Sequence, residues 1–252
     1  MEMLGLLLAA IFLPLFPMGM VFNLVFQRTR NAWLRSVLLV TWPFAGLCIL
    51  EATAVQVPVV FAFWALFSAV LYGFRALVIR EVSIWTGFLA TSAWALIWVS
   101  ITVGLDPWKL VFHVSAFSLP LALLVLMTAE VESRYESAYA GIVSGIAEAQ
   151  PRLAGVLVII MLAVIGSPLF PGFFALLDSL MHAMQVRPVA AAGVIVVWML
   201  WSWSGIQLLQ QLLVGPATAV RGSDMSRTMT FGYGLSLSAL LVAGIYQSGM
   251  ML

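Results

Sequence analysis

Eight long apolar runs, separated by short polar segments, dominate the pattern of hydrophobic and polar positions along the chain. Each run has roughly 18 residues or more with few charges, which is the length that a helix needs to cross a lipid bilayer. The predicted spans cover residues 4–26, 36–54, 57–74, 82–103, 108–129, 153–182, 189–213 and 229–250. Because the connections are short, we predict an all-α polytopic membrane helical bundle that forms a single transmembrane domain over residues 1–252.

One of these runs, residues 153–182, is interrupted near its middle by Gly166, Pro168, Pro171 and Gly172. Proline lacks an amide hydrogen and its ring clashes with the preceding turn, and lipid offers no water to replace the lost hydrogen bonds. We therefore predict one discontinuous helix, whose freed backbone groups face other protein or a wet cavity. Prolines predict kinks in three other spans (Pro14 and Pro17 in the first, Pro43 in the second and Pro120 in the fifth).

The composition agrees with a membrane protein, since 63% of residues are hydrophobic and only 8% are charged, against roughly 25% charged in a soluble domain. A single cysteine excludes a disulfide framework. The first run lacks a basic region before it and a small-residue cleavage site, so we predict that it is retained as a span. No phosphate loop, nucleophile elbow, metal-ligand spacing or strongly basic run is present, so no cofactor, metal, nucleic acid or catalytic site of its own is expected.

The positions of the basic residues predict the topology. If the N-terminus is outside, nine of the eleven Lys and Arg residues fall at the cytoplasmic side, and only Lys109 and Arg187 fall outside. Such an asymmetry in short loops sets the orientation of membrane helices. We predict a protein of the bacterial inner membrane with both termini outside and the longest loop, residues 130–152, in the cytoplasm.

That loop carries apolar residues at spacings of three and four, which is typical of an amphipathic helix. One interpretation is a docking element for a partner, and the other is a solvated connector. The candidate docking residues are Tyr135, Tyr139, Ile142 and Ile146.

Ionisable residues inside a membrane are costly, and each is a functional candidate for that reason. His113 lies about one turn inside the fifth run, where an imidazole can relay protons or serve as a hydrogen-bonded structural residue. Asp178 follows the predicted break, where burial would let it bind and release a proton, unless it is solvated at the interface. Glu51, near the outer end of the second run, is a further relay candidate.

Several of these segments together resemble the antiporter-like membrane subunits of respiratory complex I, multisubunit sodium/proton antiporters, membrane-bound hydrogenases and inorganic-carbon pumps. PRLA at 151–154 and LAVIGSPLFPGF at 162–173 are similar to that family's M-P-x-x-A run and its discontinuous helix L-A-x-x-G-x-P-x-x-x-G-F. HVSAF at 113–117 resembles an H-A-x-x-K segment of the family's central polar axis, and GP at 215–216 resembles the end of a family span. The resemblance covers about residues 75–216.

The departures from the family pattern matter for what the resemblance implies. Phe117 stands where the family has a lysine, Leu176 stands where it has Glu or Lys, and Arg75 matches an axis lysine. Family members are about twice as long and contain two inverted five-helix repeats. The resemblance therefore implies a shortened relative in which part of the charged axis is missing, with Arg75 as one more relay candidate.

Three hypotheses follow. The first is a small antiporter-like subunit that acts as a half-channel or a scaffold in a multisubunit membrane complex. The complex would couple proton or sodium movement to respiration, ion exchange or inorganic-carbon uptake. Its other membrane subunits would include a full-length antiporter-like chain. The second is a stand-alone secondary transporter with its substrate bound at the broken helix. The third adds a soluble cytoplasmic partner that residues 130–152 recruit, as the resemblance to inorganic-carbon pumps allows.

Overall fold

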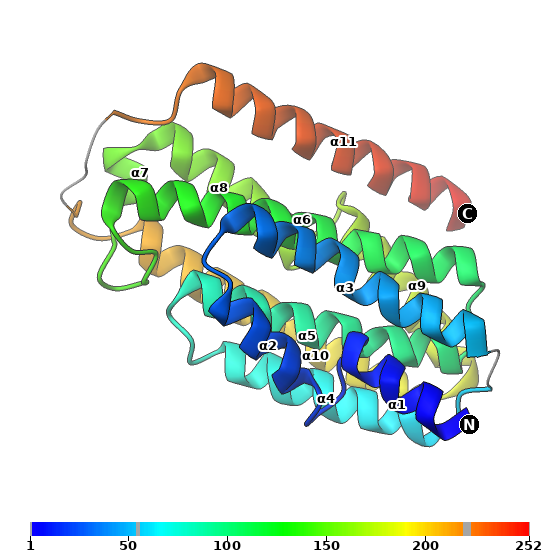
Figure 1. Cartoon of the computed structure of the whole chain (residues 1–252). Coiled ribbons are helices and arrows are strands. Elements are labelled where there is room, and N and C mark those ends of the chain that lie inside the picture. The colour runs from blue at the N-terminus through cyan, green and yellow to red at the C-terminus, as the bar shows by residue number, and fades with distance from the viewer. Residues whose placement is uncertain (1, 54–55, 219–222, 252) are drawn as a thin grey trace.

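A computed structural model of the chain describes residues 2–53, 56–218 and 223–251 as a bundle of eleven helices, with two isolated β-bridges and no strand in these ranges (Figure 1). The helices run side by side along the length of the bundle, and both termini lie at the same end. The predicted all-α helical fold is confirmed. The helices are α1 Glu2–Phe12, α2 Gly19–Arg28, α3 Ala32–Thr53, α4 Val60–Ala76, α5 Val82–Thr102, α6 Pro107–Tyr135, α7 Ile146–Ala149, α8 Pro151–Val164, α9 Pro171–Val186, α10 Pro188–Leu213 and α11 Arg227–Met251.

Five of the described helices, α3, α5, α6, α10 and α11, are long and apolar enough to cross a membrane, and α1, α4 and α8 are shorter apolar helices. The chain is therefore an integral membrane protein.

Helix α5 forms the centre of the bundle because it is apolar on all sides, a property of helices that other helices surround. Its residues from Leu89 to Ser100 are all buried, including Trp94 and Trp98. Helix α4 packs closely along α5 through a face of small residues (Ala62, Ala65, Ala69, Gly73 and Ala76). Small residues let helix backbones approach closely where lipid supplies no hydrophobic drive for association.

The interruption predicted near residue 168 is present between α8 and α9. Helix α8 ends at Val164, Gly166 adopts a positive φ of 67°, and α9 begins at Pro171. Leu169 also has a positive φ, of 83°, which is uncommon for a residue other than glycine. The break is thus a short irregular connection that joins two helices, as the glycines and prolines of the sequence predict.

The first predicted span, residues 4–26, is also discontinuous, so the kink that Pro14 and Pro17 predict is a complete break in the helix. Helix α1 ends at Phe12 and α2 begins at Gly19. The connection between them contains Pro-Leu-Phe-Pro at 14–17, the same tetrapeptide that lies at 168–171 in the other break. Two prolines three residues apart remove two helical hydrogen bonds within one turn, which a single kink does not accommodate.

Tryptophan side chains satisfy carbonyl groups that the breaks release. At the first break, the indole Nε1 of Trp98 donates to Leu13 O at 2.8 Å and that of Trp64 donates to Phe16 O at 2.7 Å. Trp42 likewise donates to Ile11 O at 3.1 Å. At the second break, Trp198 donates to Ile165 O at 3.2 Å. Buried carbonyl groups need such partners because no water reaches them.

The segment after α6 does not form the amphipathic helix that its spacing predicts. Glu136 ends α6 in the left-handed conformation, and the chain then turns back. Val82 N–H donates to Ala138 O at 3.1 Å, and Ala140 N–H donates to Arg80 O at 2.8 Å. This pairing ties the segment to the start of α5.

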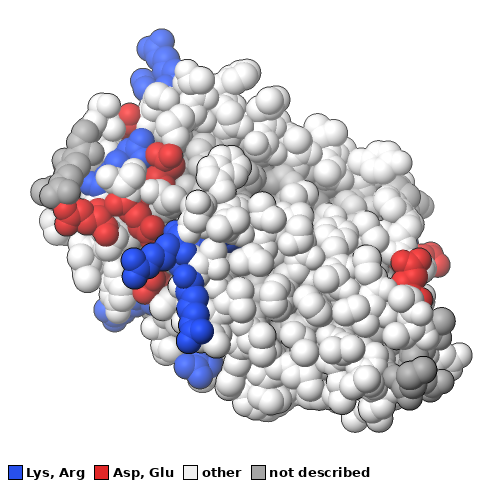
Figure 2. Space-filling model, in the orientation of Figure 1, with Lys and Arg blue, Asp and Glu red and all other residues white. Residues whose placement is uncertain are grey.

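Charged side chains gather at the ends of the bundle, and on the face in Figure 2 the Lys and Arg residues lie at one end. This arginine-rich end consists of the described connections at 29–31, 77–81, 136–150, 214–218 and 223–226 together with the adjoining helix ends. The long apolar surface between the two ends matches a chain that lies in lipid.

Helix α11 is the most peripheral element and packs on α8 and α9 (Figure 1). Gly244 lies against the second break, where a Cβ atom would clash with the carbonyl oxygen of Leu169. Leu237 and Leu240 are buried, while most other side chains of α11 face outward. The helix therefore covers the break through a close glycine contact.

Candidate functional site

Two helices bring four ionisable side chains together at the end opposite the arginine-rich end. Helix α6 begins with Pro107 at its first position, where proline is favoured, and carries Lys109 and His113 one turn apart on the same face. Helix α9 begins with Pro171 and carries Asp178 and His182 at the same spacing. These two pairs face each other and form what we call the polar cluster.

Asp178 lies at the centre of the cluster, with its side chain only 3% exposed. Its Oδ1 atom lies 3.2 Å from Lys109 Nζ and 3.3 Å from His182 Nδ1, and its Oδ2 atom lies 3.2 Å from His113 Nε2. Asp178 Oδ2 and His113 Nε2 are close, but their geometry is not that of a hydrogen bond. His182 Nδ1 also lies 2.8 Å from the Asp178 carbonyl oxygen. The carboxylate is thus buried but has a cation as a neighbour, the arrangement that makes a buried charge tolerable.

Exposure falls steadily from the rim of the cluster inward. The side chains of His182 and Lys109 are 36% and 27% exposed, whereas that of His113 is completely buried. His182 and Lys109 therefore lie nearest the surface of the bundle, Asp178 lies deeper, and His113 is completely buried.

Behind His113 lie two buried hydroxyl groups. His113 Nδ1 lies 3.4 Å from Ser179 Oγ and 3.5 Å from Ser100 Oγ, and the two oxygens are 2.8 Å apart. Ser179 also donates to Ala175 O at 2.9 Å. Since imidazole has two distinct nitrogens, His113 connects the carboxylate on one side with the hydroxyl groups on the other.

Farther into the bundle a layer of large apolar side chains follows the polar cluster. Phe117, one turn after His113, packs edge-on against Trp201 with ring centroids 5.8 Å apart. Leu176 and Trp94 are also buried in the core. Phe117 and Leu176, the positions at which the resemblance implies charged residues, are apolar here. The buried hydroxyl groups beside these rings accept indole N–H groups, with Ser118 bound to Trp94 at 3.0 Å and Ser92 to Trp201 at 2.8 Å.

The structure places the other two relay candidates outside the cluster. Glu51 is exposed in the last turn of α3. Arg75 is in the last turn of α4, at the arginine-rich end, with its guanidinium 5.4 Å from the centroid of the Phe88 ring. Arg75 also lines a groove of about 440 Å³ together with Asn23 and Tyr72. Among the described residues, Asn23 Oδ1 and the Tyr72 hydroxyl group have no hydrogen-bond partner.

The docking candidates do not share one surface. Tyr135 and Ile146 are buried, whereas Tyr139 and Ile142 are 38% and 66% exposed. The exposed pair lies on either side of Gly141, which has a φ of 94°. The four candidates therefore do not form one exposed helix face.

Sequence reasoning missed Lys109 and His182 as members of the site. Lys109 follows Asp106 and Pro107, a pattern that is typical of a surface turn with ordinary charges. A signal was present, because a Lys to His pair and an Asp to His pair occur at a spacing of four residues near the same end of two predicted spans.

No family model and no curated protein matches the sequence. Solved membrane complexes do match the structure. A chain of respiratory complex I from Thermus thermophilus, with bound NADH, has a TM-score of 0.81 at 19% identity, covering 97% of this chain and 54% of that one. The chain has the fold of half of that subunit.

Two other complexes show the same likeness. A chain of the membrane-bound sulfane sulfur reductase, an archaeal respiratory membrane complex, has a TM-score of 0.83 at 15% identity and covers 96% of this chain and 52% of that one. A chain of the Mrp complex from a Dietzia species has a TM-score of 0.87 at 15% identity, covering 99% and 57%. The chain thus spans about half the length of the solved chains that it matches, and its resemblance to antiporter-like subunits is confirmed at the level of the fold.

Proposed function

We propose that the chain is an antiporter-like subunit of a multisubunit membrane complex and forms a half-channel for protons. The burial of Asp178 between Lys109 and His113 carries this proposal. Buried ionisable groups in a membrane are costly and mark ion pathways. The structural neighbours, which belong to multisubunit membrane complexes, support the assignment to such a complex.

The geometry supports a sequence of proton transfers inward from the rim. A proton that enters past His182 and Lys109 binds the Asp178 carboxylate and weakens its attraction to the Lys109 ammonium group. The proton then passes from Oδ2 to the facing Nε2 of a neutral His113. The resulting imidazolium donates its other proton from Nδ1 to the hydroxyl pair of Ser100 and Ser179, and the pair gives up one of its own hydroxyl protons to an acceptor outside this chain.

The apolar layer at Phe117 and Leu176 limits what this chain does alone. Proton transfer requires polar groups or water in hydrogen-bond reach, and neither side chain offers one. A partner subunit would therefore provide the other half of the path, or the hydroxyl pair would deliver protons sideways to that subunit. This is the role that we assign to a full-length antiporter-like partner.

The decisive experiment measures proton uptake by the intact complex in proteoliposomes after substitution of the cluster. Asp178→Asn and His113→Ala each remove one step, and each should lower proton uptake at least roughly tenfold, since positioned proton carriers contribute 10²-fold or more. Asp106→Asn is the matched control, because Asp106 is an exposed carboxylate at the same end, and it should leave uptake unchanged.

If Asp178→Asn and His113→Ala assemble normally and retain full proton uptake, the relay is wrong and the chain acts as a scaffold. If the chain purifies in mild detergent without any other membrane subunit, and the chain alone shows proton uptake in proteoliposomes, the assignment to a complex is wrong as well.

A second candidate function is a stand-alone secondary transporter, favoured by the first break, between α1 and α2, because it gives the chain two discontinuous helices. Two discontinuous helices are a feature of transporters that bind substrate at unwound backbone. Tryptophan indoles already occupy several of the freed carbonyl groups, however. Substrate-dependent transport by the purified chain in liposomes would support the transporter and contradict the need for partners.

Two finer proposals concern the surroundings of the chain. The arginine-rich end faces the cytoplasm of a bacterium, with both termini outside the inner membrane, because basic loops stay on the cytoplasmic side. A soluble cytoplasmic partner would contact the exposed turn at Tyr139 and Ile142. Replacing both residues by serine should release that partner from the purified complex without removing the membrane subunits.

A further inference from the structure

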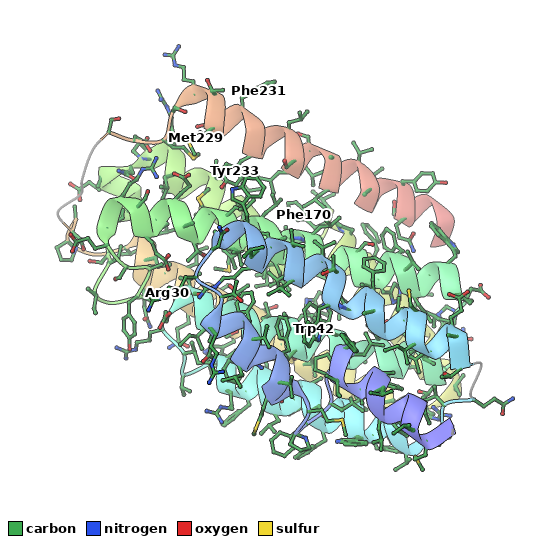
Figure 3. All side chains as sticks on the ribbon, viewed as in Figure 1. Arg30, Trp42, Phe170, Met229, Phe231 and Tyr233 are labelled. Atoms are coloured by element: carbon green, nitrogen blue, oxygen red, sulfur yellow. The ribbon has the colours of Figure 1, made fainter. Side chains whose placement is uncertain are left out.

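A groove of about 540 Å³ runs along the outer face of α11 at the arginine-rich end. It is lined by Arg152, at the start of α8, and by α11 residues that recur at spacings of three and four (Arg227, Thr230, Phe231, Gly234, Leu235 and Ser238). Figure 3 shows Phe231 on the side of α11 away from the bundle and Tyr233 on the side toward it. The groove is therefore open to the lipid that surrounds the bundle.

The length of the groove corresponds to one leaflet. From Arg227 to Ser238 the helix advances by eleven residues, or about 16 Å at 1.5 Å per residue. The hydrocarbon core of a bilayer is about 30 Å thick, so about half of that thickness lies along the groove. Apolar and small side chains line its inner part, and two arginines lie at its end.

The guanidinium groups of the two arginines are available to a ligand. Among the described residues, neither guanidinium forms an ion pair with a carboxylate. Arg152 Nη1 makes only a 3.4 Å contact with Met225 O. Asp224 is the carboxylate near Arg152, but it accepts the backbone N–H groups of Arg152, Leu153 and Met225. Both arginines line the same groove without an ion pair, so each can offer its guanidinium group to a phosphate.

We propose that this groove binds one anionic phospholipid, with the phosphate between Arg152 and Arg227 and an acyl chain along α11. The arginines at one end of the groove match the headgroup of such a lipid, and the apolar residues along the rest of the groove match its acyl chain. Basic pockets at helix ends hold anionic headgroups in membrane proteins. The amino end of α11, where Arg227 lies, adds a favourable dipole for a phosphate. The proposal is independent of proton transfer in the polar cluster.

The bound lipid also has a structural consequence. Helix α11 packs mainly on α8 and α9, and its Gly244 lies against the second break. A lipid in contact with both Arg152 and α11 would link α11 to the start of α8. We therefore expect phosphatidylglycerol to raise the thermal unfolding temperature of the purified chain more than phosphatidylcholine does.

Binding is tested on the full chain in mild detergent by titration with dioleoyl phosphatidylglycerol or dioleoyl phosphatidylcholine, followed by native mass spectrometry. The wild type should bind the anionic lipid roughly tenfold more tightly or better, since each arginine near an anionic lipid contributes a factor of about five. The double variant Arg152→Gln with Arg227→Gln should lose this preference.

The matched control is Arg28→Gln with Arg30→Gln, which removes two exposed charges from the same end outside the groove. It should keep the preference for phosphatidylglycerol. If it loses as much as the groove variant, the preference reflects the net charge of that end and the site is wrong.

A second variant tests the tail. A Cβ at Gly234 meets no atom within 4 Å, so Gly234→Leu fills the groove without disturbing the packing of α11. It should weaken phosphatidylglycerol binding at least about fivefold, because loss of an apolar contact of this size corresponds to roughly that factor, while both arginines remain. Unchanged binding by Gly234→Leu, or by the double arginine variant, would overturn the proposal.

Discussion

At the scale of single residues, the polar cluster depends on one carboxylate that serves several neighbours. Asp178→Ala leaves the ammonium group of Lys109 and the imidazole of His113 without their anionic neighbour. Loss of one partner of a buried polar pair costs about 1–3 kcal/mol, and Lys109 can turn toward solvent because it is 27% exposed. We expect a destabilisation in the lower part of that range, measured by reversible unfolding in detergent micelles.

Removing both members of the ion pair separates stability from function. Lys109→Met with Asp178→Leu replaces two charges by apolar groups, which is often neutral or even stabilising for buried pairs. We expect this double variant to recover most of the stability lost in Asp178→Ala, yet to remain inactive in proton uptake by the complex. Recovery of proton uptake together with stability would show that the cluster only holds α6 and α9 together.

At the scale of elements, tryptophan indoles decide whether the broken helices are stable in lipid. Trp98→Phe keeps an aromatic ring for packing against Phe61, whose ring centroid lies 5.1 Å from that of Trp98, but leaves Leu13 O without its donor. The expected loss is about 0.5–2 kcal/mol in the free energy of unfolding in micelles. Trp33→Phe, on a side chain that is 71% exposed, should change it by less than the error of the measurement.

A carboxylate from the connection before α11 caps the start of α8. Asp224 accepts the N–H groups of Arg152 at 2.9 Å and Leu153 at 3.2 Å, two donors that a helix start leaves free. Partial burial acts to raise the pKa of Asp224, but these backbone donors, with that of Met225, outweigh it and hold the pKa below its ordinary value. A carboxyl group with a lowered pKa stabilises the folded state above its unfolded pKa and loses this effect as pH falls through the lowered value.

Asp224→Ala should therefore destabilise the protein by about 0.5–2 kcal/mol near neutral pH, the usual loss for a helix cap. The difference from the wild type should shrink once the pH falls below about 4, the ordinary value for Asp, and continue to shrink as the wild-type carboxylate is protonated. Unfolding in micelles at pH 6 and pH 3 checks this. An equal difference at both pH values would mean that the side chain acts through packing and not through its charge.

The two breaks show what the sequence could predict and what it could not. The second break carries glycines beside its prolines, and Gly166 does adopt a positive φ, so local chemistry was sufficient. The first has prolines without glycine at the break itself, and only the repeated Pro-Leu-Phe-Pro shows that it is the same kind of connection. After α6, the apolar spacing predicts a helix, but Gly141 and Gly145 adopt positive φ angles and the chain turns there instead. In that segment the glycines decide the structure and the apolar spacing does not.

At the scale of the whole molecule, the charge distribution predicts one orientation in the membrane. Both termini lie at the end opposite the arginine-rich end, so one reporter position tests the orientation of the bundle. A reporter at the C-terminus that is active only outside the cytoplasm should be active, because basic loops remain inside. A cytoplasmic C-terminal reporter would reverse the whole assignment of inner and outer ends.

The distribution of polar groups through the bundle also predicts how the isolated chain behaves. The polar cluster at one end is separated from the arginine-rich end by the layer that contains Phe117, Leu176 and Trp201. This layer was not predictable from residue types alone, because it depends on which faces of α6, α9 and α10 meet. A proton cannot cross it without a chain of polar groups or water.

We therefore expect liposomes that contain only this chain to dissipate an imposed pH gradient no faster than protein-free liposomes, within about twofold. The intact complex in the same lipid should dissipate or build the gradient in a manner that depends on Asp178. The measurement is the decay of a pH-sensitive dye signal with matched protein content. Rapid, Asp178-dependent leakage through the isolated chain would show that the apolar layer opens, and that this chain holds a complete path and not one half of it.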